Sequence, residues 1–263
     1  MSSFYVTATG PHLRQQALAL AAFCQLPWRQ DPSALPAGSM LLVLTDTRLE
    51  LRQHLSNCRP VYVDFLQGHL AHRRQFGGGG SQLIARAVGL KHQKGLRVLD
   101  LTAGLGQDGF VLACCGCSVH LLERHPVIYQ LLRDGFVRAH TDAFFQSLHF
   151  DLSFKAAQDV LSQPMSVPPD VIYLDPMYPT QKKSAEAKKE MIFLRRLVGD
   201  DQDAAALLAP ALSVAHSRVV VKRARLAPVL AGLSPDLVYH GKSSRFDVYL
   251  CKKTSNKTTD KQS

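Results

Sequence analysis

From Leu96 onward the sequence alternates between short apolar segments and longer segments in which apolar residues recur at helical spacing. The apolar segments are LRVLDL, VHLLE, LHFDLS, VIYLD, RVVVKR and FDVYLC, and the helical segments QDGFVLACC and PVIYQLLRDGFVRA separate the first three of them. Strands that alternate with helices usually pair in parallel and are buried on both faces, so they are apolar throughout. This pattern predicts a doubly wound, Rossmann-like α/β domain.

The first part of the chain follows a different pattern. Short β-like runs (FYVTAT, MLLVLT and VYVDFL) surround a helical stretch, RQQALALAAFCQL, and a proline-rich loop. Four glycines at 77–80 then lead into an amphipathic helix. We predict a small α/β appendage over residues 1–75, the main domain over 76–251 and a polar tail over 252–263.

Composition narrows the possible partners. The chain has 31 Lys and Arg against 21 Asp and Glu, a net charge of +10, which favours a polyanionic partner. The sequence contains no apolar run of the roughly 18–20 residues that span a bilayer, and its N-terminus does not resemble a signal peptide. Its six cysteines and eleven histidines lack metal-ligand spacing. We expect a cytoplasmic monomer without a metal, and cysteines that are reduced.

The turn after the first strand of the main domain is the expected ligand site, because ligands of such sheets bind outside the carboxyl ends of the strands. It reads DLTAGLGQDG from Asp100 to Gly109. Gly104 and Gly106 allow a tight turn and close approach of a ligand. Glu123 ends the second strand, 19 residues after Gly104, where an acid can hold ribose hydroxyls. The glycine spacing alone also fits a dinucleotide-binding oxidoreductase.

Two acidic residues favour S-adenosylmethionine over NAD as the ligand. Asp100 and Asp108 flank the glycine turn and would repel a pyrophosphate, whereas they would attract a sulfonium or ammonium group. The fourth strand also ends in Asp175-Pro176-Met177-Tyr178-Pro179, for which a dehydrogenase has no use. The sequence therefore predicts a methyl-donor site.

The segment Asp175-Pro176-Met177-Tyr178 is similar to the [D/N]-P-P-[Y/F/W] loop of methyltransferases that act on the amino groups of nucleobases. An exocyclic amine is a poor nucleophile because its lone pair is delocalised into the ring. Asp175 and a backbone carbonyl held by Pro176 can accept both N–H bonds and direct the lone pair at the methyl carbon. Tyr178 can stack on the base once it is flipped out.

Basic residues follow this loop and end the fifth strand. They are expected to contact the phosphates of a nucleic acid, at the same edge of the sheet as Asp175. The candidate RNA-binding residues are Lys182, Lys183, Lys188, Lys189, Lys222 and Arg223.

Together these segments resemble the ribosomal RNA small subunit methyltransferase J family, from about Pro60 to Tyr249. The shared segments are VYVDF, AHRRQFGGG, VLDLTAGLGQD, LLERHP, YLDPMYP, KKEM, VVVKR and RFDVY. The resemblance implies a class I methyltransferase that modifies N2 of one guanine near the 3′ end of 16S rRNA, with the rRNA or the small ribosomal subunit as its partner.

The resemblance also implies residues that hold the methyl donor. These are Gln107 and Asp108, Glu123 and Arg124, Leu152 and Ser153, and Asp175. The sequence departs from the family at three places. Gln107 replaces a usual Arg, Gly-Gly-Gly-Gly-Ser-Gln at 77–82 replaces GGGRGE, and Tyr178 replaces a common Phe.

Two other functions fit parts of the same pattern. The loop at Asp175 also serves adenine and cytosine amino-methyltransferases that act on DNA. A catalytically idle, RNA-binding ribosome assembly factor would retain the fold and the basic surface. The first predicts methylation of duplex DNA, and the second predicts that Asp175→Ala leaves RNA-dependent function intact.

Overall fold

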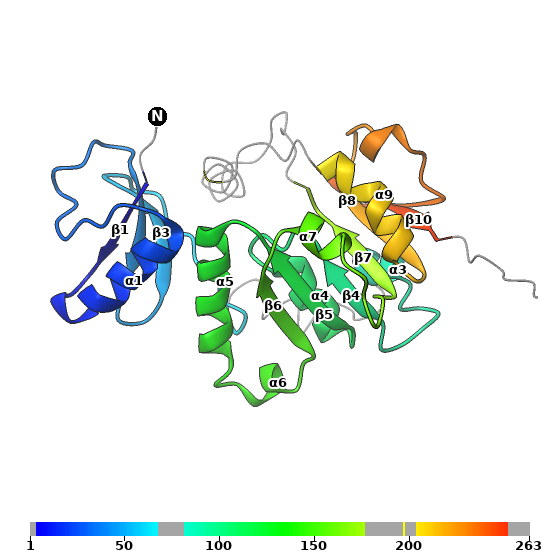
Figure 1. The fold of residues 1–263 in the computed structure, drawn as a ribbon, viewed down its shortest axis with the longest axis horizontal. Helices are drawn as coiled ribbons and strands as arrows, with labels where there is room; N and C mark the ends of the chain where they lie inside the picture. Colours follow the sequence, from blue (N-terminus) through cyan, green and yellow to red (C-terminus); the bar gives the residue numbers. More distant parts are fainter. Residues whose placement is uncertain (1–3, 68–81, 177–196, 198–203, 252–263) are drawn as a thin grey trace, which may run out of the picture.

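The structure is a computed structural model that describes residues 4–67, 82–176, 197 and 204–251. The chain forms a three-stranded sheet and a larger sheet of seven strands. Figure 1 shows the small sheet at the N-terminal end and the large sheet in the rest of the described chain. Helix α5 lies at the side of the large sheet that faces the small one. The mixed α/β architecture with an appended N-terminal unit is the predicted one.

The large sheet has the strand order β6-β5-β4-β7-β8-β10-β9. Its strands are β4 (Arg97–Asp100), β5 (Ser118–Glu123), β6 (Phe150–Phe154), β7 (Val171–Leu174), β8 (Arg218–Ala224), β9 (Leu237–His240) and β10 (Ser244–Leu250). All neighbouring pairs from β6 to β8 are parallel. The chain order reverses between β4 and β7, which creates the switch point at which ligands of such sheets bind.

The far side of the sheet differs from a purely parallel arrangement. Strand β10 pairs antiparallel with both β8 and β9. Only residues 241–243 connect β9 to β10, and so short a connection can join only antiparallel neighbours. The sequence pattern predicted the strand at FDVYLC as part of a parallel series, and this direction was wrong. It predicted no strand at β9, whose side chains are mostly exposed.

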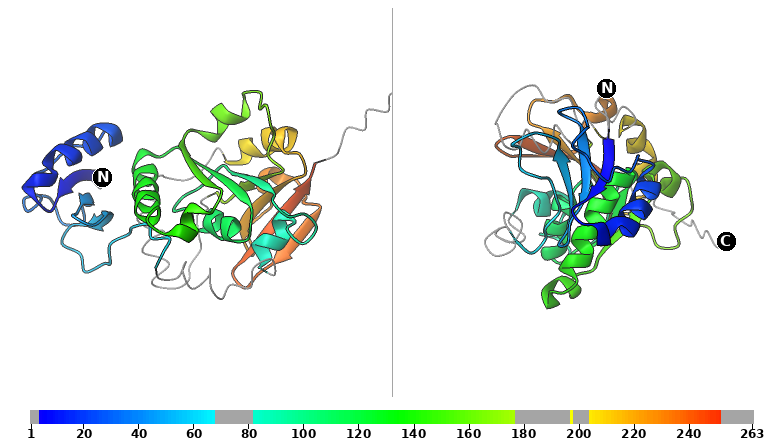
Figure 2. Two further views of the ribbon diagram at one scale, coloured as in Figure 1. Left: turned by 90° about the horizontal axis from the view of Figure 1, so that it is seen from below. Right: turned by 90° about the vertical axis from the view of Figure 1, so that its left-hand side faces the viewer.

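Helices cover both faces of the large sheet (Figure 2). One face packs against α3 (Leu83–Val88), α4 (Gln107–Cys114) and α5 (Pro126–Ala139), and the other against α7 (Ala157–Leu161) and α9 (Ala204–Val214). Two short elements, α6 (Ala143–Gln146) and η3 (Leu230–Gly232), lie in connections. No helix in the described ranges is long and apolar enough to cross a membrane.

The N-terminal unit consists of β1 (Phe4–Ala8), η1 (Pro11–Leu13), α1 (Arg14–Cys24), β2 (Met40–Leu44) and β3 (Leu49–Gln53). Strand β2 lies in the centre, parallel to β1 and antiparallel to β3. The expectation of a strand at VYVDFL was wrong. The third strand is LELRQ, and Val61 forms only an isolated bridge with Leu51.

The alternation of apolar and polar residues in VYVDFL comes from packing against the core rather than from a strand. Val61, Val63 and Phe65 are buried, and the Phe65 ring lies 5.0 to 5.6 Å from four phenylalanine rings of the large domain. Gly135 of α5 makes room for this segment, because a Cβ atom there would lie 2.5 Å from Val63 Cγ1. The segment therefore fixes the N-terminal unit to the core of the large domain.

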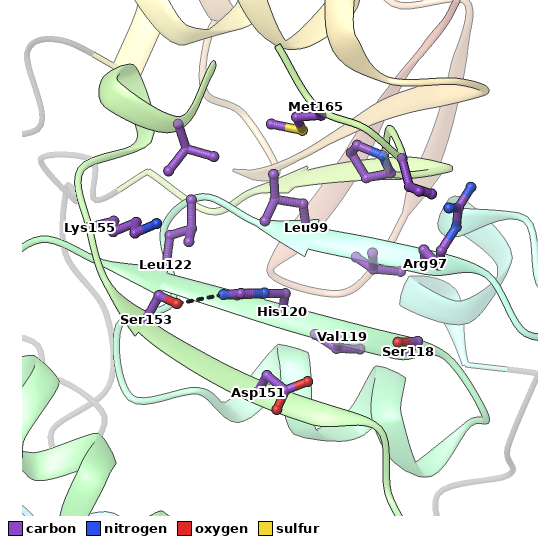
Figure 3. A pocket seen from close by; sticks show the side chains of 14 residues that line it. Arg97, Leu99, Ser118, Val119, His120, Leu122, Asp151, Ser153, Lys155 and Met165 are labelled. Atoms are coloured by element: carbon purple, nitrogen blue, oxygen red, sulfur yellow. Dashed lines mark hydrogen bonds between the residues drawn. The ribbon is translucent and has the colours of Figure 1, made fainter. Parts of the chain in front are cut away.

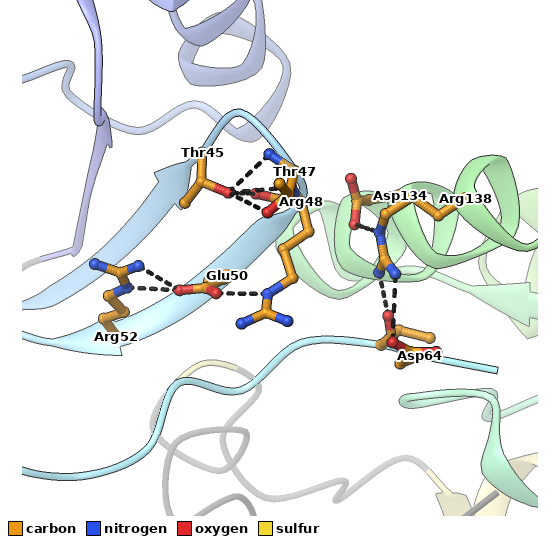
Figure 4. A network of polar contacts seen from close by, with 9 residues as sticks. Thr45, Thr47, Arg48, Glu50, Arg52, Asp64, Asp134 and Arg138 are labelled. Atoms are coloured by element: carbon orange, nitrogen blue, oxygen red, sulfur yellow. Dashed lines mark hydrogen bonds and ion pairs between the residues drawn. The ribbon is translucent and has the colours of Figure 1, made fainter. Parts of the chain in front are cut away.

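Polar contacts hold the same segment against α5 (Figure 4). The guanidinium of Arg138 donates to Oδ2 of Asp134 at 2.9 Å and to the carbonyl of Val63, and it lies 3.8 Å from Oδ2 of Asp64. These contacts give hydrogen-bond partners to a backbone carbonyl and to carboxylates that lie next to the apolar contact of Phe65.

Candidate active site

The candidate site lies at the carboxyl ends of β4, β5, β7 and β8. Four acidic side chains predicted from the sequence come from this edge, namely Asp100, Asp108, Glu123 and Asp175. The charges of the other three all act on the pKa of Asp100. Parallel pairing of β4 with β5 and β7 explains why acids so distant in sequence lie together.

The glycine turn has the conformation that its sequence requires. Gly104 and Gly106 have φ values of +55° and +71°, a region that side chains rarely adopt. A Cβ atom on Gly106 would also lie 2.7 Å from Leu132 Cδ2, whereas one on Gly104 would meet nothing closer than the Thr102 carbonyl oxygen at 4.0 Å. Gly106 is thus needed for packing, and Gly104 leaves space at the turn where a ligand can approach.

Glu123 connects the two turns that border this space. Its Oε2 accepts a hydrogen bond from the Gly104 N–H at 3.1 Å, and its Oε1 accepts one from the His125 N–H at 2.7 Å. The side chain is buried at the end of β5. The carboxylate therefore fixes the glycine turn and the start of α5 relative to each other.

Asp100 is a buried acid in an unfavourable electrostatic environment. Its Oδ1 accepts a hydrogen bond from the Thr102 N–H at 3.0 Å. Burial, together with the negative charges of Asp108, Asp175 and Glu123, raises the pKa of Asp100 to about 8. A cation bound beside these acids would relieve both the repulsion and the cost of ionising Asp100.

Asp108 lies in the first turn of α4, where the helix dipole favours a negative charge. Its Oδ2 accepts a hydrogen bond from the Tyr173 hydroxyl at 2.8 Å and one from Lys222 Nζ at 2.6 Å. Tyr173 is buried on β7, and burial together with the charge of Asp108 raises its pKa well above the usual value. The hydroxyl therefore acts as a neutral donor that holds Asp108.

Asp175 follows β7 directly and is held from two sides. Its backbone N–H donates to Thr102 Oγ1 at 2.6 Å, and its Oδ2 accepts from Lys222 Nζ at 2.9 Å. Thr102 belongs to the glycine turn, so the loop that begins at Asp175 is fixed to that turn. Pro176 is buried next to it.

These features fit S-adenosylmethionine. The four carboxylates suit its sulfonium and ammonium groups, and the space at Gly104 allows the ligand to approach the backbone. An acid at the position of Glu123 is where adenosyl ribose hydroxyls are held in sheets of this kind. The same acids would repel a pyrophosphate, which argues against a dinucleotide.

Other residues expected at the donor site differ in their positions. Gln107 and Arg124 are exposed at the carboxyl edge, one at the start of α4 and the other directly after β5. Leu152 is paired with Leu121 inside the sheet and packs against the core. Ser153 Oγ lies 2.8 Å from His120 Nε2. The structure thus brings Gln107 and Arg124 to the site edge, whereas Leu152 lies inside the sheet and Ser153 contacts His120.

Ser153 instead lines a pocket on the face of the sheet that carries α7 (Figure 3). The pocket has a volume of about 350 Å³, and Leu99, Leu122 and Met165 are among the apolar residues that line it. None of the four acids lines it. The pocket is therefore separate from the candidate active site.

The expected RNA-binding residues need correction at the end of β8. Arg223 is 2% exposed and donates to the carbonyl of Pro228, so it does not form part of an RNA-facing surface. Lys222 bridges Asp108 and Asp175. Side chains alternate between the two faces along a strand, so Arg223 turns into the core and Lys222 turns toward the acids. Tyr178, Lys182, Lys183, Lys188 and Lys189, like the glycine run and the tail, lie outside the described residues.

Sequence reasoning missed Thr102 and Tyr173. Each carries a weak signal. Thr102 is the polar residue in the stretch LTAGLG, and Tyr173 brings a hydroxyl group into the otherwise apolar strand VIYL.

The described residues offer no candidate metal site. They contain no group of three or more His, Cys, Asp or Glu that could hold a metal ion.

Comparison with known proteins agrees with this geometry. Residues 29–251 match a family model described as "Putative SAM-dependent methyltransferase". A protein of Coxiella burnetii named ribosomal RNA small subunit methyltransferase J is 58% identical over 218 residues, which cover 82% of this chain and 85% of that protein. A protein of the same name from Photobacterium profundum is 47% identical over 251 residues, covering 89% of this chain and 98% of the relative.

A solved structure shows the same architecture. A SAM-dependent methyltransferase from Neisseria gonorrhoeae superimposes with a TM-score of 0.70 at 35% identity, covering 95% of this chain and 97% of that protein. The superposition leaves out only 5% of this chain, so it includes residues of both the small and the large sheet.

Proposed function

The chain belongs to the ribosomal RNA small subunit methyltransferase J family, and on this basis we propose that it transfers a methyl group from S-adenosylmethionine to N2 of a guanine in 16S rRNA. The observation that carries the proposal is the position of Asp175. This acid begins the Asp-Pro-Met-Tyr loop and is tied to the glycine turn through Thr102. This tie supports the proposal that the Asp175 carboxylate accepts an amine N–H beside a bound cationic donor.

On the donor side, Glu123 would accept hydrogen bonds from the ribose hydroxyls. Asp100 and Asp108 would face the positively charged part of the donor, and Gln107 and Arg124 would border it. The glycine turn would let the donor lie against the backbone beside Gly104. Bound there, the donor supplies a methyl group on a positively charged sulfur, which is an electrophile.

On the acceptor side, Asp175 would accept one N–H of the guanine amine, and the backbone carbonyl fixed by Pro176 would accept the other. The amine lone pair then points at the methyl carbon. The new N–C bond forms as the C–S bond breaks, and the C–S electron pair remains on sulfur. The surplus amine proton leaves to water after transfer. Orientation and charge, rather than a strong base, would supply most of the acceleration.

The base must leave its stack to reach Asp175. Tyr178 would stack on the flipped guanine, which is worth about 1–3 kcal/mol. Lys182, Lys183, Lys188 and Lys189 would contact the phosphates. Replacing all four by Ala is expected to reduce the slope of log K against log salt by about 0.7–0.9 for each phosphate that is no longer neutralised. Replacing Lys91 and Lys94, on the loop before β4, is the control for a general loss of charge.

Methyl transfer can be tested directly with radiolabelled S-adenosylmethionine. Small ribosomal subunits, naked 16S rRNA and duplex DNA would each be incubated with the wild-type chain and with Asp175→Ala. We expect label in one or both RNA substrates, mass spectrometry of nucleosides showing N2-methylguanosine, and no label with the variant. Label in DNA alone would identify a DNA amino-methyltransferase instead.

The idle assembly factor gives a different result. It predicts that the wild-type chain binds the small subunit without labelling any substrate, and that Asp175→Ala binds and functions equally well. Binding to the RNA would be measured in the same preparations by sedimentation with the subunits.

A further inference from the structure

Lys222 has an unusual position between the donor side and the acceptor side of the site. Its Nζ lies 2.6 Å from Asp108 Oδ2 and 2.9 Å from Asp175 Oδ2. The pairing of Leu174 with Val221 between β7 and β8 explains this position, because it brings the next residue of each strand to the same level. The Lys222 side chain is 28% exposed, which is low for a lysine that binds RNA by its charge alone.

The surroundings of Lys222 hold its charge in place. Burial by itself lowers the pKa of an amine, but the carboxylates of Asp175 and Asp108 outweigh it and raise the pKa of Lys222 above its usual value. The lysine is therefore a permanent cation, and its charge acts on both carboxylates that it bridges.

We propose that Lys222 is a positioning residue for methyl transfer, which fixes the Asp175 carboxylate and, as a shared counter-cation, limits how strongly the site prefers the charged donor over the neutral product. This inference rests on the proposed function, because it assigns Asp175 to the acceptor amine and Asp108 to the donor.

The first part of the proposal follows from the hydrogen bonds. Lys222 anchors one carboxylate oxygen of Asp175, and Thr102 anchors the backbone of the same residue. A carboxylate held at both points presents its acceptor atoms to the amine in one orientation. Small misplacements of an orienting group lower the rate of a reaction that depends on alignment.

The second part follows from the charge change in the reaction. S-adenosylmethionine has a positive sulfur, and S-adenosylhomocysteine has a neutral one, so transfer removes one positive charge from the site. The four acids favour the charged form, and Lys222 offsets part of their field. Without Lys222 the site would hold the donor more tightly relative to the product.

The test compares the affinities of the two ligands for the wild-type chain, Lys222→Met and Lys222→Arg. Calorimetry would give Kd for S-adenosylmethionine and for S-adenosylhomocysteine at one pH. We expect Lys222→Met to shift the ratio of the two constants toward S-adenosylmethionine by about fivefold or more. Lys222→Arg keeps the charge, so its ratio should stay within about twofold of wild type. Lys91→Met, far from the acids, is the control.

Steady-state kinetics completes the test. Lys222→Met should lower kcat by about tenfold or more. A merely structural role would change both ligand affinities in parallel and leave their ratio unchanged, and that result would overturn the proposal. If Lys222→Met does not fold, Lys222→Gln takes its place, and an unchanged ratio in that variant would overturn the proposal in the same way. If neither variant folds, a ratio for Lys222→Arg that differs from wild type by clearly more than twofold would overturn it, because the charge is kept.

The two proposals fail in different ways. A wild-type chain that binds neither ligand would contradict the proposed function. A wild-type chain that binds both, with an unchanged ratio in Lys222→Met, would contradict only the role of Lys222.

Discussion

The backbone N–H of Gly104 donates a 3.1 Å hydrogen bond to Oε2 of Glu123, so the glycine turn after β4 is fixed to the end of β5. The other carboxylate oxygen holds the His125 N–H at the start of α5. One side chain thus organises two of the loops that border the donor site. Replacing it should disturb the shape of the site in addition to removing any hydrogen bond to a ligand.

We expect Glu123→Ala to weaken binding of S-adenosylhomocysteine by at least about 1 kcal/mol, or about fivefold. The variant loses the acceptor for ribose hydroxyls and the tie to Gly104. Isothermal titration calorimetry measures the effect, and thermal unfolding shows whether the variant is folded. Asp151→Ala removes an exposed acid from the neighbouring strand β6 and should leave Kd unchanged. Equal binding by Glu123→Ala and wild type would exclude Glu123 from the donor site.

Binding of S-adenosylmethionine should release a proton near neutral pH. The pKa of Asp100 is about 8 without a ligand, because of burial and the charges of three other acids, so its carboxyl is mostly protonated at pH 7. A cationic donor favours the ionised form. Calorimetry in two buffers with different ionisation enthalpies would detect the released proton. In Asp100→Asn the release should largely disappear, and a release of the same size in both proteins would show that another group is responsible.

Asp100 should also make the ligand-free protein less stable as the pH rises. Its pKa is raised from 3.8, the ordinary value expected in the unfolded chain, so the folded state binds the proton more tightly. The protonated carboxyl contributes its full share to the free energy of unfolding below about pH 4. This contribution decreases between about pH 4 and about pH 8 and does not change further above about pH 8. Denaturation by urea at several pH values should show a weaker pH dependence for Asp100→Asn than for wild type.

The buried ion pair of Arg245 and Asp247 should be important for folding. Its two hydrogen bonds measure 2.7 and 3.0 Å, and Asp247 has no exposed surface. Replacing one partner leaves a buried charge uncompensated, so Asp247→Ala should reduce the free energy of unfolding by about 3–5 kcal/mol. The double replacement Arg245→Met with Asp247→Ala should cost less than the sum of the two single changes. Chemical denaturation of the four proteins gives this comparison, and simple additivity would contradict the coupling.

Phe65 should be among the most sensitive positions of the core. It is 1% exposed and joins the segment after β3 to rings from α4, α5, α6 and β6. Phe65→Ala should destabilise the protein by about 3–5 kcal/mol, because apolar surface is no longer buried and a cavity remains. Phe23 is 40% exposed, so Phe23→Ala is the matched control and should cost clearly less. Equal losses of stability for the two variants would show that Phe65 does not fix the N-terminal unit to the core.

Much of the fold and of the site follows from local sequence. The helix predicted at PVIYQLLRDGFVRA is α5, Pro126–Ala139, because its apolar positions recur at helical spacing and its proline suits a first turn. The glycine turn and the acids at strand ends could be placed together because parallel strands end at one edge of the sheet. Which side chains form hydrogen bonds with each other at that edge, such as Lys222 with Asp108 and Asp175, could not be predicted in the same way.

By itself the sequence determined the strands β4 to β8 and β10 and the helices α4 and α5 of the large domain, that these strands form a largely parallel sheet, and that acids and glycines gather at its carboxyl edge. These are properties of local periodicity and of chain direction. The tertiary structure decided which face each side chain occupies. It placed Phe65 in the core rather than in a strand, buried Arg223 under a loop and directed Lys222 to Asp108 and Asp175. Such choices depend on strand register and on contacts between residues far apart in sequence, and no local pattern contains that information.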